Sequence, residues 1–279
     1  MPKMNALWSI ASFATLLTGP ALAASWHSMP TASVATYRYE MRETVGTSPA
    51  KGNRMDVRLH FDGNGGVIAD VISVATLDGD TAAPVAVDPN CAKAMSARPA
   101  EIASLRLFPL SEARGKLGDE FLAACAPDVV FLPLTDILNV VLVQASDRFH
   151  AHDLKTVGQS IDYPGFATSL DRTWIAMTET SDGGTTRLAA LDPDHVTLDW
   201  SPNIARLHLV EQNGGKPTTL DGTEHFAFRL TLDAKSGQLE RADALYDDLD
   251  VTLSSAMVQP EILPRLKIKR AVSITRLPG

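Results

Sequence analysis

A regular alternation of apolar and polar residues dominates this sequence and restricts what the chain can fold into. From Arg54 to Phe61 every odd position is apolar and every even position is polar. Successive side chains of a β-strand point to opposite faces, so this pattern predicts a strand with one face on a core and the other in water. Residues 37–42 alternate in the same way, and the glycine-rich run 62–66 predicts a turn. We therefore expect three antiparallel strands between positions 34 and 77.

The same periodicity resumes after Gly158 and continues to the end of the chain. The candidate strands are separated by short turns rich in Gly, Pro, Asp and Asn, and they cover residues 168–180, 185–191, 195–200, 205–211, 225–232, 239–253 and 266–277. Short connections of this kind join antiparallel neighbours. A sheet of about ten such strands curls under its own twist. The sequence therefore predicts a mainly β fold, built on a curved antiparallel sheet that forms a half-barrel or a barrel-like meander.

A stretch richer in Ala and Leu, at about residues 78–157, separates the two β-rich blocks. Helix-compatible spacing covers residues 101–107, 117–126 and 135–145. In the last of these, Thr135 or Asp136 could cap the start, and one apolar stripe contains Ile137, Leu138, Val141 and Leu142. We expect this helical insertion to act as a lid over the open face of the sheet, within a single β-rich domain at 24–279. In architecture this plan is similar to periplasmic lipoprotein-carrier and lipid-binding proteins, a similarity that no shared motif accompanies.

The N-terminal residues have the pattern of an export signal. Lys3 precedes an apolar run over residues 6–17, and Gly19 and Pro20 then break the run before Ala21-Leu22-Ala23. Small residues at the first and third of these positions match the site that signal peptidase cleaves. We therefore predict a signal peptide at 1–23, cleavage near Ala23, and a periplasmic or extracellular mature chain.

The other strongly apolar run, residues 129–145, contains Asp136 and Pro133. An ionised carboxylate at the centre of a bilayer costs a few kcal/mol at least, so this run predicts a buried helix and not a membrane span. No span is expected in the mature chain.

The net charge and the cysteine content limit which binding partners and which cellular compartment are expected. The net charge is −8 and the basic residues are scattered, which opposes binding to nucleic acid or to an anionic membrane. Cys91 and Cys125 are the two cysteines. In an oxidising compartment they are expected to form a disulfide that closes a loop of about 35 residues. A pair of buried free thiols is the alternative.

No catalytic or metal-binding motif is present. His150 and His152 lie two residues apart, but zinc needs a third ligand and none stands at a recognisable spacing. Gly158-Gln159-Ser160 lacks the closing glycine of a hydrolase nucleophile elbow. We therefore assign no catalytic residue, no metal and no cofactor.

Two of the apolar strand faces each carry one charged residue. Asp247 falls on the face of Leu245, Leu249, Val251 and Leu253, and Arg270 falls on the face of Leu266 and Ile268. If these strands form a hairpin through the 254–265 loop, a register that joins the two residues buries an Asp247–Arg270 ion pair inside the curved sheet. The alternative is a bulge that turns both side chains into water.

The function predicted from these features is non-catalytic binding of an apolar small molecule or lipid, or of a partner's apolar segment, on the concave sheet. The candidate lining residues, which ordinary core packing would explain equally well, are Phe226, Phe228, Leu249, Val251 and Ile268. One alternative is an envelope assembly protein that binds another protein without a ligand. A second alternative is a hydrolase whose site is assembled from residues distant in sequence.

Overall fold

The computed structural model describes residues 26, 31–61, 67–89, 130, 132–142, 153–171, 175–202, 204–213, 216–255 and 265–279. Several sequence predictions concern residues outside these ranges. They are the signal peptide, the Cys91–Cys125 disulfide, the helices at 101–107 and 117–126, and the His150–His152 pair.

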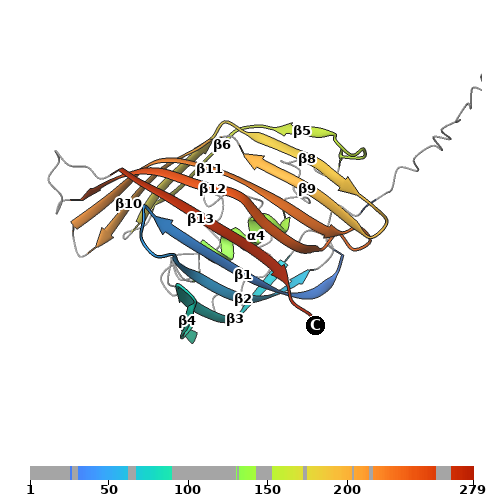
Figure 1. Cartoon of the computed structure of the whole chain (residues 1–279), viewed down its shortest axis with the longest axis horizontal. Coiled ribbons are helices and arrows are strands. Elements are labelled where there is room, and N and C mark those ends of the chain that lie inside the picture. Colours follow the sequence, from blue (N-terminus) through green and yellow to red (C-terminus); the bar gives the residue numbers. More distant parts are fainter. Residues whose placement is uncertain are drawn as a thin grey trace, which may run out of the picture.

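Antiparallel strands make up most of the described chain (Figure 1). They are β1 (Ser33–Val45), β2 (Lys51–Phe61), β3 (Val67–Asp78), β4 (Thr81–Val85), β5 (Ser160–Tyr163), β6 (Phe166–Asp171), β7 (Ile175–Ser181), β8 (Gly184–Leu191), β9 (His195–Pro202), β10 (Ala205–Asn213), β11 (Lys216–Asp233), β12 (Leu239–Ser255) and β13 (Arg265–Arg276). All belong to one sheet. The predicted curved antiparallel architecture is therefore confirmed.

The strand order departs from a simple meander at two places. The main path runs β4-β3-β2-β1-β13-β12-β11-β10-β7-β6, so the first strand pairs with the last. The long strand β11 then has two neighbours on one side, because its first half pairs with β10 and its second half pairs with β9. The sheet consequently forks at β11 into one branch of β10, β7 and β6 and another of β9, β8 and β5.

The tight turn between β7 and β8 joins these two branches. Gly183 in this turn has φ of 101°, a backbone conformation that side chains other than glycine rarely adopt. A Cβ at this position would lie 2.3 Å from the carbonyl oxygen of Tyr163. Glycine is thus required here on two independent grounds.

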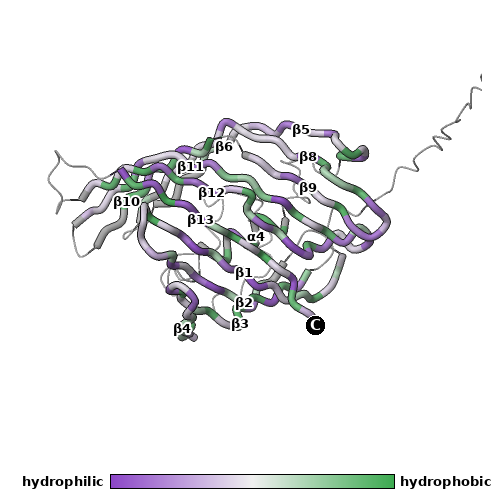
Figure 2. The backbone as a smooth tube through the Cα atoms, viewed as in Figure 1, coloured by the Kyte–Doolittle hydropathy of each residue, from purple (hydrophilic) through white to green (hydrophobic). Residues whose placement is uncertain are grey.

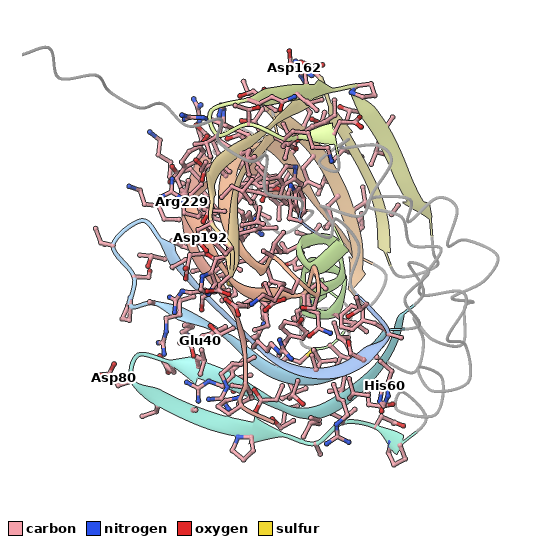
Figure 3. The ribbon with its side chains drawn as sticks, turned by 90° about the vertical axis from the view of Figure 1, so that its right-hand side faces the viewer. Glu40, His60, Asp80, Asp162, Asp192 and Arg229 are labelled. Carbon is pink, nitrogen blue, oxygen red and sulfur yellow. The ribbon has the colours of Figure 1, made fainter. Side chains whose placement is uncertain are left out.

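The sheet is curved but not closed, since its path ends at β4 and β6. Figure 3 shows the strands curling around helix α4 (Leu132–Leu142), which lies on the concave side. The helix contributes Leu134, Ile137, Val140 and Val141 to the continuous hydrophobic core. We call this face of the sheet the inward face.

Hydrophilic and hydrophobic residues are interspersed along the strands (Figure 2). Because successive side chains of a strand point to opposite faces, this alternation determines which residues face inward. Tyr37 and Tyr39 on β1 are buried, as are Met55 and Val57 on β2, while the residues between them are partly exposed. Burying each large side chain contributes about 1.5–3 kcal/mol, so the inward face provides most of the stability of the sheet.

The structure confirms the three strands predicted between 34 and 77 and corrects several boundaries. The single strand predicted at 168–180 is two strands, β6 and β7, and the short strands β4 and β5 were not predicted. β11 begins at Lys216, nine residues before the predicted start at His225. The segment that was missed contains Pro217, Asp221 and Gly222, residue types that are depleted in strands.

The predicted helix at 135–145 corresponds to α4, but the predicted cap is wrong. The helix begins at Leu132, so Thr135 and Asp136 lie within it. Ile137 and Val141 from the predicted apolar stripe are fully buried. Among the described residues, no helix is long and apolar enough to cross a membrane.

Candidate functional site

Three charged residues form a row across the inward face of the sheet. Glu224 lies on β11, Asp247 on β12 and Arg270 on β13. Arg270 Nε donates to Asp247 Oδ2 at 2.9 Å, and Arg270 Nη2 donates to Asp247 Oδ1 at 3.0 Å. Arg270 Nη2 also donates to Glu224 Oε1. We call these three residues the charged row.

The strand register explains why the three side chains of the charged row lie close together. Asp248 pairs with Lys269 and Leu249 with Ile268, which brings positions 247 and 270 alongside each other. On the other side of β12, Asp247 pairs with Phe226, two residues from Glu224. Arg270 can therefore reach both carboxylates with one guanidinium group, a planar donor suited to such contacts.

A β-bulge in β12 decides that Asp247 faces inward. Ala227 pairs with Tyr246 but Phe228 pairs with Ala244, so β12 has one extra residue at this point. Leu245 and Tyr246 consequently both point outward, with 49% and 48% of their surface exposed, while Asp247 is only 4% exposed. The sequence prediction that Leu245 shares the face of Asp247 is wrong, because the bulge inverts the alternation between them.

Burial and neighbouring charges change the pKa values of Asp247 and Arg270 in the charged row. Removal from water raises the pKa of Asp247 to about 7; the Arg270 guanidinium lowers it and the negative charge of Glu224 raises it further. Burial alone would lower the pKa of Arg270, but the surrounding carboxylates raise it above its ordinary value. One guanidinium thus does not fully compensate the carboxyl groups around it.

Asp136 of α4 adds a further carboxyl group to this region. Tyr39 Oη donates a hydrogen bond to Asp136 Oδ2 at 2.8 Å, linking β1 to the helix. Burial raises the pKa of Asp136 to about 6, against the opposing effects of Arg270 and of the Tyr39 hydrogen bond. Sequence analysis missed this role, although Asp136 lies one helical turn from the buried Val140, a spacing that places both on one helix face.

On one side of the charged row the inward face is filled. Trp200 packs against Phe226 with ring centroids 5.5 Å apart and against Phe228 at 6.0 Å. Trp200 Nε1 donates to Tyr163 Oη at 3.1 Å. These aromatic residues belong to the continuous core, together with Leu230 on β11 and Val272 and Ile274 on β13. Phe226 and Phe228, both predicted to line a ligand site, are therefore core residues here.

On the other side of the row the inward face carries aliphatic residues outside that core. We call them the inner apolar strip, which comprises Leu220, Leu249, Val251, Leu253, Leu266 and Ile268. Val251 is buried and the other five are partly exposed. Register joins them, because Leu220 pairs with Leu253, Val251 with Leu266, and Leu249 with Ile268. Three of the five predicted lining residues, Leu249, Val251 and Ile268, lie in this strip.

The histidines of the described chain do not form a catalytic arrangement at this site. His60 Nε2 lies 2.9 Å from Asp70 Oδ2, and His208 Nδ1 lies 2.5 Å from Asp221 Oδ1. All four side chains are between 38% and 59% exposed, and they connect neighbouring strands. Over the described ranges, no group of three or more His, Cys, Asp or Glu residues could hold a metal ion.

Comparison with known proteins gives no relative: no protein family, curated protein or solved structure matches this chain.

Proposed function

We propose that the mature chain is an exported, non-catalytic protein that holds an apolar small molecule or lipid on the inward face of its curved sheet. The observation that carries this proposal is the inner apolar strip. Five of its six side chains are partly exposed on the inward face of an unclosed sheet, although they are as apolar as the core residues beyond the charged row. An apolar ligand of modest size would cover them and gain about 25 cal/mol per Å² of apolar surface removed from water.

The neighbouring elements support the same proposal. The charged row lies between the strip and the filled core, where a polar group of a ligand would find charged partners. Helix α4 lies on the concave side and serves in this proposal as the lid. Export is supported by the signal-peptide pattern at residues 1–23, and a carrier in the envelope would meet lipids there.

Native mass spectrometry of the protein, exported in a bacterial host and purified without detergent, tests the proposal. We expect a mass excess that solvent extraction resolves into an apolar molecule. Two neighbouring substitutions on opposite faces of β12 make a matched pair: Leu253→Asp alters the strip, and Thr252→Asp places the same charge on the other face. The adduct should disappear in the first variant and persist in the second.

Binding of the fluorescent apolar probe N-phenyl-1-naphthylamine to the extracted protein gives a second measurement. Saturable binding that Leu253→Asp weakens at least tenfold supports carriage on the strip. A wild type that has no adduct and binds no probe would rule out carriage. Equal binding by both variants would place any ligand elsewhere on the molecule.

A second candidate function, protein assembly without a ligand, is favoured by one feature. The bulge in β12 exposes Leu245 and Tyr246 side by side on the outward face, where a partner could cover them. A photo-crosslinking amino acid in place of Tyr246 tests this candidate in the periplasm of an expressing cell. Formation of one discrete crosslinked species, absent when Arg241 is replaced in the same way, would support it. The absence of any such species would count against it.

A further inference from the structure

Helix α4 carries a single ionisable side chain, and that side chain faces the sheet. In Leu132–Leu142 the only titratable residue is Asp136. Its carboxylate accepts the hydrogen bond from Tyr39, while Leu134, Ile137, Val140 and Val141 of the same helix are buried in the core. Asp136 is therefore part of the contact between α4 and the sheet.

The described groups that face Asp136 are mostly acidic. β1 contributes Tyr39 and also Glu43, which pairs in register with Arg270. β11 and β12 contribute Glu224 and Asp247, and β13 contributes the one cation, Arg270. The inward residues of β2 are apolar and include Met55, Val57 and Leu59. Among the described residues, the Arg270 guanidinium therefore stands near three carboxyl groups that act on it, those of Glu224, Asp247 and Asp136.

The surroundings of Asp136 favour the protonated form of its carboxyl group. Burial raises the pKa of Asp136 from 3.8 to about 6, and nearby Asp247 adds to the rise. A carboxyl group whose pKa is higher in the docked helix than in water binds its proton more tightly when docked. Its contribution to docking is complete below pH 4 and is lost as the pH rises through 6. Asp247, with a pKa of about 7, acts in the same direction.

We propose that the docking of α4 on the sheet is coupled to proton uptake, so that the helix is held closed in mildly acidic solution and loosens as the pH rises. The proposal deepens the proposed function, because it names what controls the lid over the concave face. It rests on the proposed function in one respect only: if the concave face holds a ligand, then undocking of α4 opens the binding site. The coupling itself needs no ligand.

Hydrogen–deuterium exchange of the full chain between pH 5 and pH 8, corrected for intrinsic exchange rates, measures this coupling directly. In the wild type, protection of the peptide that covers residues 132–142 should fall as the pH rises. The difference between a pKa of 3.8 and one of about 6 allows a change of up to about 100-fold in the docking equilibrium. Protection of the strands β1 and β2 should change much less.

Three variants sharpen the test. Asp136→Asn keeps an acceptor for Tyr39 and removes the charge, so its α4 protection should be higher at pH 8 than in the wild type and should fall less as the pH rises. Asp247 accounts for the dependence that remains. Asp162→Asn is the matched control, because Asp162 is an exposed carboxylate on β5 that accepts from Thr185, and it should behave as the wild type. Tyr39→Phe removes a hydrogen bond that lowers the pKa of Asp136, so its transition should move to higher pH.

The outcomes separate this inference from the proposed function. A wild-type α4 whose protection does not change with pH would overturn the coupling, as would an Asp136→Asn variant that titrates like the wild type. If Asp136→Asn did not fold, the direction of the shift in Tyr39→Phe would decide, and a shift to lower pH would overturn the proposal. An apolar adduct in native mass spectrometry together with a pH-independent helix would leave the proposed function standing and remove only the coupling.

Discussion

The two sides of the charged row have the same sequence pattern but different packing. On one side, Phe226, Phe228 and Trp200 form contacts within the continuous core. On the other side, Leu249, Leu253 and Ile268 lie on the same inward face and remain partly exposed. Alternation tells which face of a strand is apolar, but it does not tell what covers that face. The comparison therefore separates buried core residues from apolar residues of the same face that are partly exposed, to which we assign a ligand only by proposal.

The charged row lies between these two regions and follows neither pattern. Asp247 is 4% exposed and accepts two hydrogen bonds from Arg270. A buried ion pair contributes little net stability, because the loss of hydration offsets most of the Coulomb attraction. Its removal by a single substitution is nevertheless costly, because the remaining charges stay buried.

The largest effect is expected for Phe228→Ala in the filled core. Loss of its contacts with Trp200 and Phe226, and the cavity that remains, should lower the free energy of unfolding by about 4 kcal/mol in urea denaturation. Arg229→Ala, the exposed neighbour on the other face, should cost about 1 kcal/mol or less. Similar losses for the two variants would contradict the assignment of Phe228 to the core.

Next in size is Arg270→Met, which removes the cation from the charged row. Asp247 and Glu224 would then face each other without compensation, and we expect a loss of about 3 kcal/mol at pH 8. The loss should be smaller at pH 5, where Asp247 takes up a proton. Arg265→Met, which breaks the exposed pair with Asp250, provides the control and should cost about 0.5 kcal/mol. An Arg270→Met variant as stable as the wild type at pH 8 would show that the row carries no unbalanced charge.

The wild type itself should become less stable as the pH rises from 5 to 8. Asp136 and Asp247 both have raised pKa values, about 6 and about 7, so the folded state binds more protons than the unfolded chain in this range. By linkage the free energy of unfolding should fall, by up to about 4 kcal/mol over the interval. Thermal unfolding across this range measures the trend, and Asp136→Asn should reduce its slope. Constant stability, or a rise with pH, would contradict these assignments.

A smaller effect on stability is expected for Leu253→Ala in the inner apolar strip. Because Leu253 is partly exposed and lies outside the continuous core, truncation should cost about 1 kcal/mol. Binding of N-phenyl-1-naphthylamine should nevertheless weaken several-fold. A loss as large as that of Phe228→Ala would mean that the strip is packed as core and would remove the contrast between the two regions.

The sequence predicts strands correctly where apolar and polar residues alternate. β1 and β2 have period-two patterns at residues 37–42 and 54–61, and both were predicted. β3 was predicted from the turn that precedes it, although a bulge interrupts its alternation. The fork at β11 could not be predicted, because it depends on two different strands pairing with the two halves of one strand. The start of β11 was also missed, since Asp221 and Gly222 resemble turn residues and are accommodated only by pairing with β10 and β12.

Only part of the candidate site could be predicted from the sequence, because the rest depends on contacts between residues that are distant in the chain. Asp247 and Arg270 stand out because each interrupts an apolar face. Glu224 gives no such signal, because it precedes the segment that was predicted as a strand. Asp136 was predicted as a helix cap because caps are recognised from neighbouring residues in the sequence. Its actual partner, Tyr39, is 97 residues away in the chain, so the sequence pattern gave no sign of their hydrogen bond.

The extra residue in β12 has a consequence for how this gene can change. Deleting the codon for Leu245 or Tyr246 would remove the bulge, and Ala244 and Asp247 would both stay on the inward face with one outward residue between them. Asp247 would remain in the interior and Asp248 in water, each with its present strand partners. Single-residue deletions at this point should therefore be better tolerated than deletions elsewhere in the strand, which would exchange the faces of the residues that follow. A deletion scan across β12 would reveal one tolerant position that a substitution scan would not identify.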